Sequence, residues 1–180
     1  MAPTRITTLD FAILGLLIQA PRSGYAIRKA FETTALGNYS SSPGSIYPAI
    51  HKLKKLGFIR QASAESDNNR FLDITEEGKK ALKDWFTQPL SEADIAKGSN
   101  ILMLKFAFMD DLVAPADQLL FLQSFIQHTE NYLMHLKAYH QQESGAMPLH
   151  GRLAFEYGIN SFETQLNWAK SALITIEKYK

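Results

Sequence analysis

Residues Ser42 to Phe58 read Ser-Pro-Gly-Ser-Ile-Tyr-Pro-Ala-Ile-His-Lys-Leu-Lys-Lys-Leu-Gly-Phe. Apolar side chains recur in this stretch at spacings of three and four, which predicts an α-helix with one buried face: Ile46, Ala49, Ile50, Leu53 and Leu56. The opposite face carries Tyr47, His51 and Lys55, with Ser45 and Lys52 at its flank. A helix with one buried and one cationic face is a candidate recognition helix for DNA, although most such faces only contact solvent.

The start of this helix has two alternatives. Ser42 can cap it with Pro43 in the first helical position, which places Pro48 inside the helix, where its ring bends the backbone. Ser45 can cap it instead, which leaves Pro48 in the first turn, where a missing N–H is tolerated. We favour Ser42 and expect a bend.

The composition is that of an ordinary globular protein, with 46% hydrophobic and 21% charged residues in 180. The absence of cysteine excludes disulfides, thiolate metal sites and cysteine nucleophiles, and it fits a reducing cytoplasm. Residues 1–90 hold 12 Lys and Arg against 8 Asp and Glu, whereas residues 91–180 hold 7 against 10. A basic half joined to an acidic half points to nucleic acid at one end. The apolar run at 11–18 is too short to span a membrane.

The elements around the Ser42–Phe58 stretch predict a winged helix-turn-helix. The apolar run at 11–18 predicts a central helix, and Ser23 can cap a second one. Two short β-rich segments at 58–62 and 70–74 flank a polar turn, which predicts a hairpin. Thr75 can cap a further helix, with two glutamates in its first turn.

Five motifs give the first half a family resemblance. They are Leu14-Gly15-Leu16-Leu17, Ser23-Gly24-Tyr25-Ala26-Ile27, Ser42-Pro43-Gly44-Ser45-Ile46-Tyr47-Pro48, Leu56-Gly57-Phe58-Ile59 and Asp73-Ile74-Thr75-Glu76-Glu77-Gly78. The sequence resembles the PadR family of bacterial transcriptional regulators, closely over the first half and only in length and helicity over the second. The resemblance implies a dimeric DNA-binding regulator, usually a repressor, with a helical carboxyl-terminal dimerisation domain.

The second half is expected to be all-helical. Residues 89–98 contain Pro, Ser and Gly and are expected to link a winged-helix domain at 1–88 to a helical domain at 99–180. The last helix has apolar residues at alternating spacings of four and three, which is a coiled-coil pattern: Phe155, Ile159, Phe162, Leu166, Ala169, Leu173 and Ile176.

A long helix from Pro115 carries two heptad seams, one aliphatic and one aromatic. If this helix pairs with the last helix as an antiparallel hairpin, one of the two seams is buried between them. We expect a second copy of the chain to cover the spare aromatic seam, which includes Phe121, Phe125 and Tyr132.

Three other kinds of site were weighed. His128 and His135 lie seven residues apart on one helix face, but without a convergent carboxylate, so we expect no metal and no cofactor. The chain lacks a Gly-x-Ser-x-Gly turn, so a hydrolase is disfavoured. Trp168, Met103 and the aromatic seam could line a cavity for a small aromatic or hydrophobic effector, although aromatic stripes more often form core.

We therefore interpret the chain as a mainly α protein, a cytoplasmic homodimeric DNA-binding transcriptional regulator and not an enzyme. Its expected partner is a pseudo-palindromic operator, and the alternative is a winged-helix module for protein interaction. The expected DNA-binding residues are Ser23, Tyr25, Arg28, Ser42, Ser45, Tyr47, His51, Lys52, Lys55, Asn69 and Arg70. The expected dimerisation residues are Phe121, Phe125, Tyr132, Phe155, Ile159, Phe162, Leu166, Leu173 and Ile176.

Overall fold

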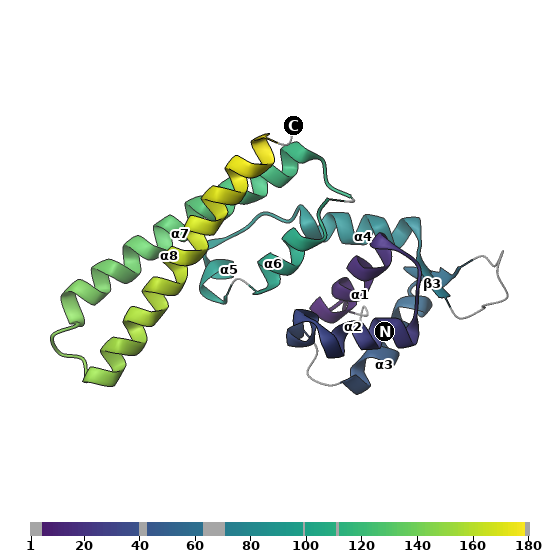
Figure 1. Cartoon of the computed structure of the whole chain (residues 1–180), viewed down its shortest axis with the longest axis horizontal. Helices are drawn as coiled ribbons and strands as arrows, with labels where there is room; N and C mark the ends of the chain where they lie inside the picture. The colour runs from purple at the N-terminus through teal and green to yellow at the C-terminus, as the bar shows by residue number, and fades with distance from the viewer. Residues whose placement is uncertain (1–4, 40–42, 63–70, 99, 111, 179–180) are drawn as a thin grey trace. The chain divides into compact units, whose positions relative to one another are not determined.

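The computed structural model describes residues 5–39, 43–62, 71–98, 100–110 and 112–178. The chain divides into two compact units (Figure 1). The first unit comprises residues 1–86 and 101–113, and the second comprises residues 87–100 and 114–180. No helix among the described residues is long and apolar enough to cross a membrane.

The described residues of the first unit form five α-helices and a small sheet. Its α-helices are α1 (Thr8–Gln19), α2 (Gly24–Thr33), α3 (Ile46–Lys55), α4 (Glu76–Phe86) and α6 (Asn100–Ala107), of which α6 has its first residue in the second unit. Short 3₁₀ turns, η1 (Ala35–Tyr39) and η2 (Pro43–Ser45), lie between α2 and α3.

Helix α1 is the centre of this unit, as its apolar sequence predicts. Residues 12–17 are all buried, and α1 contacts α3, α4 and β3. The N-cap of α1 is Thr7, whose side chain accepts a hydrogen bond from the backbone N–H of Asp10. Gly15 allows close packing, because a Cβ there would lie 2.5 Å from Cδ2 of Phe108, which follows α6.

The sheet has three antiparallel strands in the order β1-β3-β2: β1 (Arg22–Ser23), β2 (Ile59–Gln61) and β3 (Phe71–Ile74). The pairing Ile59↔Ile74 confirms the expected hairpin, while β1, paired through Arg22↔Leu72, was not expected. The Thr75 hydroxyl caps α4 by accepting a hydrogen bond from the backbone N–H of Gly78 at 3.1 Å. The expected order of three helices, a hairpin and a further helix is confirmed.

Helix α3 begins at Ile46 rather than at Pro43, so the start that we favoured is wrong. Ser45 holds the N-cap position, and Pro48 is therefore the third helical residue. Proline is tolerated there because the N–H groups of the first turn have no intrahelical partner. The helix ends at Lys55, followed by Gly57 at a φ of 76°, and the N–H of Phe58 donates to the carbonyl of Leu53 at 3.0 Å.

The second unit is an antiparallel helical hairpin with one short helix beside it. The hairpin pairs α7 (Pro115–Glu143) with α8 (Leu149–Lys178), as Figure 1 shows. The short helix α5 (Glu92–Ala96) lies within the expected linker and contacts α7. A capping box of Ser91 and Asp94 begins it. The boundaries thus differ from those expected, because residues 101–113 pack in the first unit.

Much of the aromatic seam of α7 is covered within the single chain. Phe121 and Phe125 are buried, whereas Tyr139 near the carboxyl end of α7 is 52% exposed. The ring centroids of Tyr132 and Phe162 lie 5.0 Å apart, and Phe155 of α8 lies 5.6 Å from Tyr139. Aromatic rings therefore help to close α7 on α8 within one chain, which corrects the expectation that a second copy must cover this seam.

Candidate nucleic-acid interface

The outer face of α3 places three polar side chains opposite the core. Ile46, Ile50 and Leu53 are buried against the rest of the first unit. Tyr47 is 48% exposed, and one and two turns further along His51 and Lys55 are exposed. The arrangement matches the sequence expectation for these residues. It offers a phenol, an imidazole and an ammonium to a partner, and all three can form hydrogen bonds with base edges.

The amino end of α2 continues this surface. A Cβ on Gly24 would lie 3.2 Å from Cε1 of Tyr47, so the tyrosine ring packs closely on the first residue of α2. The Ser23 hydroxyl caps α2 by accepting a hydrogen bond from the backbone N–H of Ala26 at 3.1 Å, which confirms its predicted capping role. The capping hydroxyl, the ring of Tyr47 and the helix amino end thus lie together. Helix amino ends attract phosphate because their N–H groups and the helix dipole favour anions.

Tyr25 and Arg28 form a pair on the outside of α2. Tyr25 is 60% exposed. The guanidinium carbon of Arg28 lies 5.7 Å from the Tyr25 ring centroid, and its Nε lies 3.2 Å from Oε1 of Glu32. The cation is therefore held in place at the surface, where a phosphate oxygen can compete with Glu32 for it.

Lys52, one of the residues expected to contact DNA, forms an ion pair within the first unit. Its Nζ bonds Oδ2 of Asp10, a side chain of α1 that is completely buried. The lysine side chain is 27% exposed. The sequence analysis missed this contact because the two residues are 42 positions apart.

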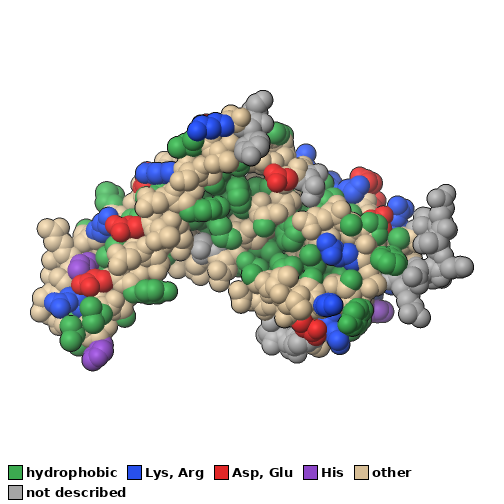
Figure 2. Space-filling model, viewed as in Figure 1, with side chains coloured by type: hydrophobic (Ala, Val, Ile, Leu, Met, Phe, Trp, Pro, Cys, Tyr) green, Lys and Arg blue, Asp and Glu red, His purple; other side chains and the backbone are tan. Residues whose placement is uncertain are grey.

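Two further cations near α3, Lys54 and Arg60, also have partners in the first unit. Lys54, which the sequence analysis did not select, donates to Oε1 of Gln61 at 3.1 Å and so joins α3 to strand β2. Arg60 Nη2 lies 3.9 Å from an Asp73 carboxylate oxygen. Figure 2 shows Lys and Arg side chains beside hydrophobic ones where Figure 1 draws α3.

Four of the predicted DNA-binding residues remain to be located. Ser42, Asn69 and Arg70 lie outside the described residues, whereas Ser45 is half-buried at the start of α3.

Partial burial raises the pKa of the Tyr39 phenol, so this group between α2 and α3 stays neutral at physiological pH. The described residues contain no cluster of His, Cys, Asp and Glu that could hold a metal, and His135 pairs with Glu92 at 3.2 Å.

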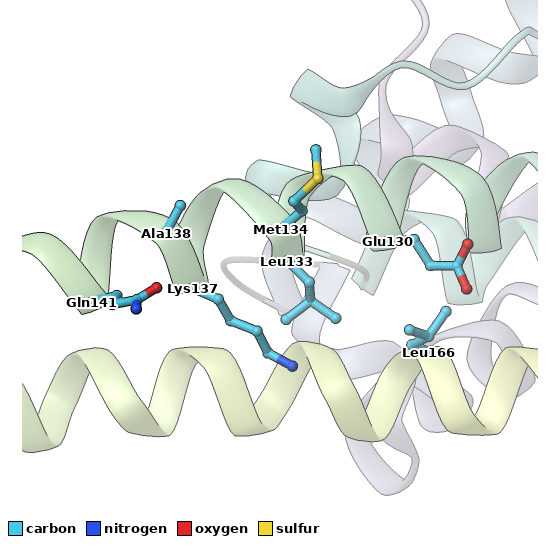
Figure 3. Close-up of a pocket in the computed structure, with 7 residues that line it drawn as sticks. All are labelled: Glu130, Leu133, Met134, Lys137, Ala138, Gln141 and Leu166. Carbon is cyan, nitrogen blue, oxygen red and sulfur yellow. The ribbon is translucent and has the colours of Figure 1, made fainter.

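A groove of about 500 Å³ opens between α7 and α8 in the second unit (Figure 3). Figure 3 shows Leu133 of α7 and Leu166 of α8 in the space between the two helices, with Lys137 reaching toward α8. Neither Trp168 nor Met103 lines this groove. Trp168 instead packs edge-on against Phe125, at 6.4 Å between ring centroids. The groove therefore differs from the effector cavity considered from the sequence.

Comparison with known proteins finds similarity that is concentrated in the first unit. The model of the transcriptional regulator PadR-like family matches residues 13–84. The negative transcriptional regulator PadR of Bacillus subtilis is 28% identical over 182 residues, which covers 94% of this chain and 98% of that protein. The transcriptional regulator YqjI of Escherichia coli is 33% identical over 76 residues, covering 42% of this chain and 36% of that protein.

A solved structure also aligns along the whole length. The crystal structure of Bacillus subtilis PadR in complex with operator DNA covers 96% of this chain and 99% of that chain, with 24% identity and a TM-score of 0.40. The family match spans α1 from Ile13 through α3 and the sheet to Asp84 in α4. The match of residues 13–84 to the PadR-like family of transcriptional regulators confirms the resemblance seen in the sequence.

Proposed function

We propose that this protein is a cytoplasmic, homodimeric transcriptional regulator that binds a pseudo-palindromic DNA operator and acts as a repressor. The observation that carries the proposal is the outer face of α3, where Tyr47, His51 and Lys55 are exposed opposite a buried apolar face. This helix lies within residues that match a family of transcriptional regulators. The relative from Bacillus subtilis, which aligns along the whole chain, is a negative transcriptional regulator.

The proposed complex places α3 in the major groove. The groove is wide enough for one helix, and the side chains of His51 and Lys55 would meet base edges there. Ser23, Tyr25 and Arg28 on α2 would contact the phosphate backbone beside the groove. Two copies related by twofold symmetry would place their α3 helices about 34–36 Å apart, one turn of DNA.

The second unit supplies apolar surface for the proposed dimer. Leu149, Leu153 and Tyr157 follow one another at intervals of four on the outside of α8 and are 57%, 50% and 75% exposed. Residues at this spacing lie on one face of a helix. Covering such a face with the same face of a second copy gives the closed, symmetric contact that is usual in homodimers.

Selection of bound sites from random duplexes by the full chain tests the proposed function. The expected result is an inverted repeat whose half-sites are about ten base pairs apart, with affinity that falls steeply as salt rises. Recovery of random sequence together with salt-independent binding would favour the protein-interaction module instead.

A further inference from the structure

A buried carboxylate in α1 holds a lysine of the recognition helix. Asp10 Oδ2 accepts hydrogen bonds from the backbone N–H of Thr7 at 2.6 Å and from its hydroxyl at 2.7 Å. The same oxygen bonds Nζ of Lys52. Asp10 is completely buried, whereas the Lys52 side chain is 27% exposed. The ion pair therefore has its anion inside the first unit and its cation at the edge of α3.

The pair is stabilised by what surrounds it. A carboxylate loses most of its hydration on burial, so it needs hydrogen bonds and a counter-charge to remain ionised. Thr7 supplies two hydrogen bonds and Lys52 supplies the counter-charge. Moving the lysine to a DNA phosphate would leave Asp10 buried without its cation. Such a separation is strongly unfavourable, which keeps Lys52 on Asp10 when DNA approaches.

The position of Lys52 makes this pairing relevant to DNA. It belongs to the same helix as His51 and Lys55, which are exposed and would face the groove. An unpaired ammonium at this flank would attract phosphate on any sequence, because phosphate contacts carry no sequence information.

We propose that Asp10 is a positioning residue: it retains Lys52 as an internal counter-ion and so removes one cation from sequence-independent phosphate binding. The inference rests on the proposed function. Asp10 acts here through Lys52, since its own side chain is buried and cannot reach DNA. Affinity for operator and for unrelated DNA is lowered alike by the contribution of one phosphate contact, while the face that carries His51 and Lys55 is unchanged.

The test compares charge-matched variants of the full chain on a selected operator and on a scrambled duplex, at several salt concentrations. Asp10→Asn keeps an acceptor for Thr7 but frees Lys52. Its binding to the scrambled duplex should strengthen roughly fivefold to tenfold at 0.1 M salt, and the salt slope should steepen by about 1, as for one added phosphate contact. Glu77→Gln, an exposed residue of α4, changes the net charge equally and should leave the slope unchanged.

The double variant Asp10→Asn/Lys52→Met removes both charges and keeps the net charge of the wild type. Because Lys52 makes no phosphate contact in the wild type, this variant should keep the wild-type salt slope. A slope lowered by about 1 would show that Lys52 already binds phosphate and would overturn the inference. Equal behaviour of Asp10→Asn and Glu77→Gln would also overturn it.

Amine acylation of the free wild-type protein tests the pair without any variant or DNA. Lys52 should react at least roughly fivefold more slowly than the exposed Lys55 nearby, because its amine is held by a carboxylate. Equal reaction rates would overturn the inference even if the variants failed to fold. If the wild type bound no duplex, the proposed function would fail while the acylation result still decided whether the pair exists.

Discussion

At the scale of single residues, solvent exposure separates groups that can read DNA from groups that hold the fold. His51 and Lys55 are exposed on α3, whereas Lys52 is engaged with Asp10. The sequence places all three on one side of the same helix. Helical periodicity gives the direction of a side chain, but not the long-range partner that it finds, so the sequence alone could not distinguish Lys52 from its neighbours.

Replacing His51 or Lys55 by alanine should weaken operator binding without altering the fold. Each variant should melt like the wild type, because both side chains are exposed. Each should lose about 1–3 kcal/mol of binding free energy for the operator and less for a scrambled duplex. Fluorescence anisotropy at one fixed salt concentration measures both affinities. Lys97→Ala removes an exposed cation from the second unit and serves as the control.

The Arg28→Ala variant should weaken binding to every duplex alike. Arg28 lies on the outside of α2 beside Tyr25, where it can contact phosphate but no base edge in the proposed complex. The slope of log affinity against log salt should fall by about 1. The matched Glu32→Gln variant removes the competing carboxylate at 3.2 Å and should strengthen binding. Unchanged slopes for both variants would mean that α2 does not meet the DNA backbone.

At the scale of elements, local sequence signals predicted most of the first unit. The caps at Ser23 and Thr75 and the stop at Gly57 are short-range features, and the structure has them. Strand β1 was missed because two residues carry no periodicity and pair with β3 only in the folded chain. Helix α5 was missed although Ser91 and Asp94 form a capping box. The start of α3 was mispredicted because Pro43 was favoured in the first helical position. The position of Pro48, which fits the first turn, indicated the correct start.

Two glycine variants should shift stability in opposite directions. A Cβ on Gly78 in α4 would lie 2.2 Å from the carbonyl oxygen of Phe58, so Gly78→Ala should destabilise the fold by about 1–3 kcal/mol. A Cβ on Gly158 in α8 has no atom within 4 Å, so Gly158→Ala should stabilise α8 by up to about 1 kcal/mol through helix propensity. Urea denaturation measures both changes. A neutral Gly78→Ala variant would show that α4 can move away from Phe58.

At the scale of the whole molecule, the heptad pattern of α8 predicted a packed seam but not its partner. Phe162 packs on Tyr132, and Ile159 is buried, within a single chain. The same spacing serves an intrachain hairpin and an interchain coiled coil equally well. Residues outside the heptad, Leu149, Leu153 and Tyr157, carry the exposed apolar face instead.

The last prediction concerns assembly. Sedimentation of the full chain at micromolar concentration should give twice the 20.2 kDa chain mass. Tyr157→Asp should lower that mass toward one chain while circular dichroism stays unchanged, because the side chain is 75% exposed and contributes little to the single chain. Phe162→Asp should instead lower the melting temperature, because it places a charge against Tyr132 inside the hairpin. A Tyr157→Asp protein that stays dimeric would show that the dimer contact lies on another face. A monomeric wild type would contradict the proposed binding of two copies to a palindromic operator.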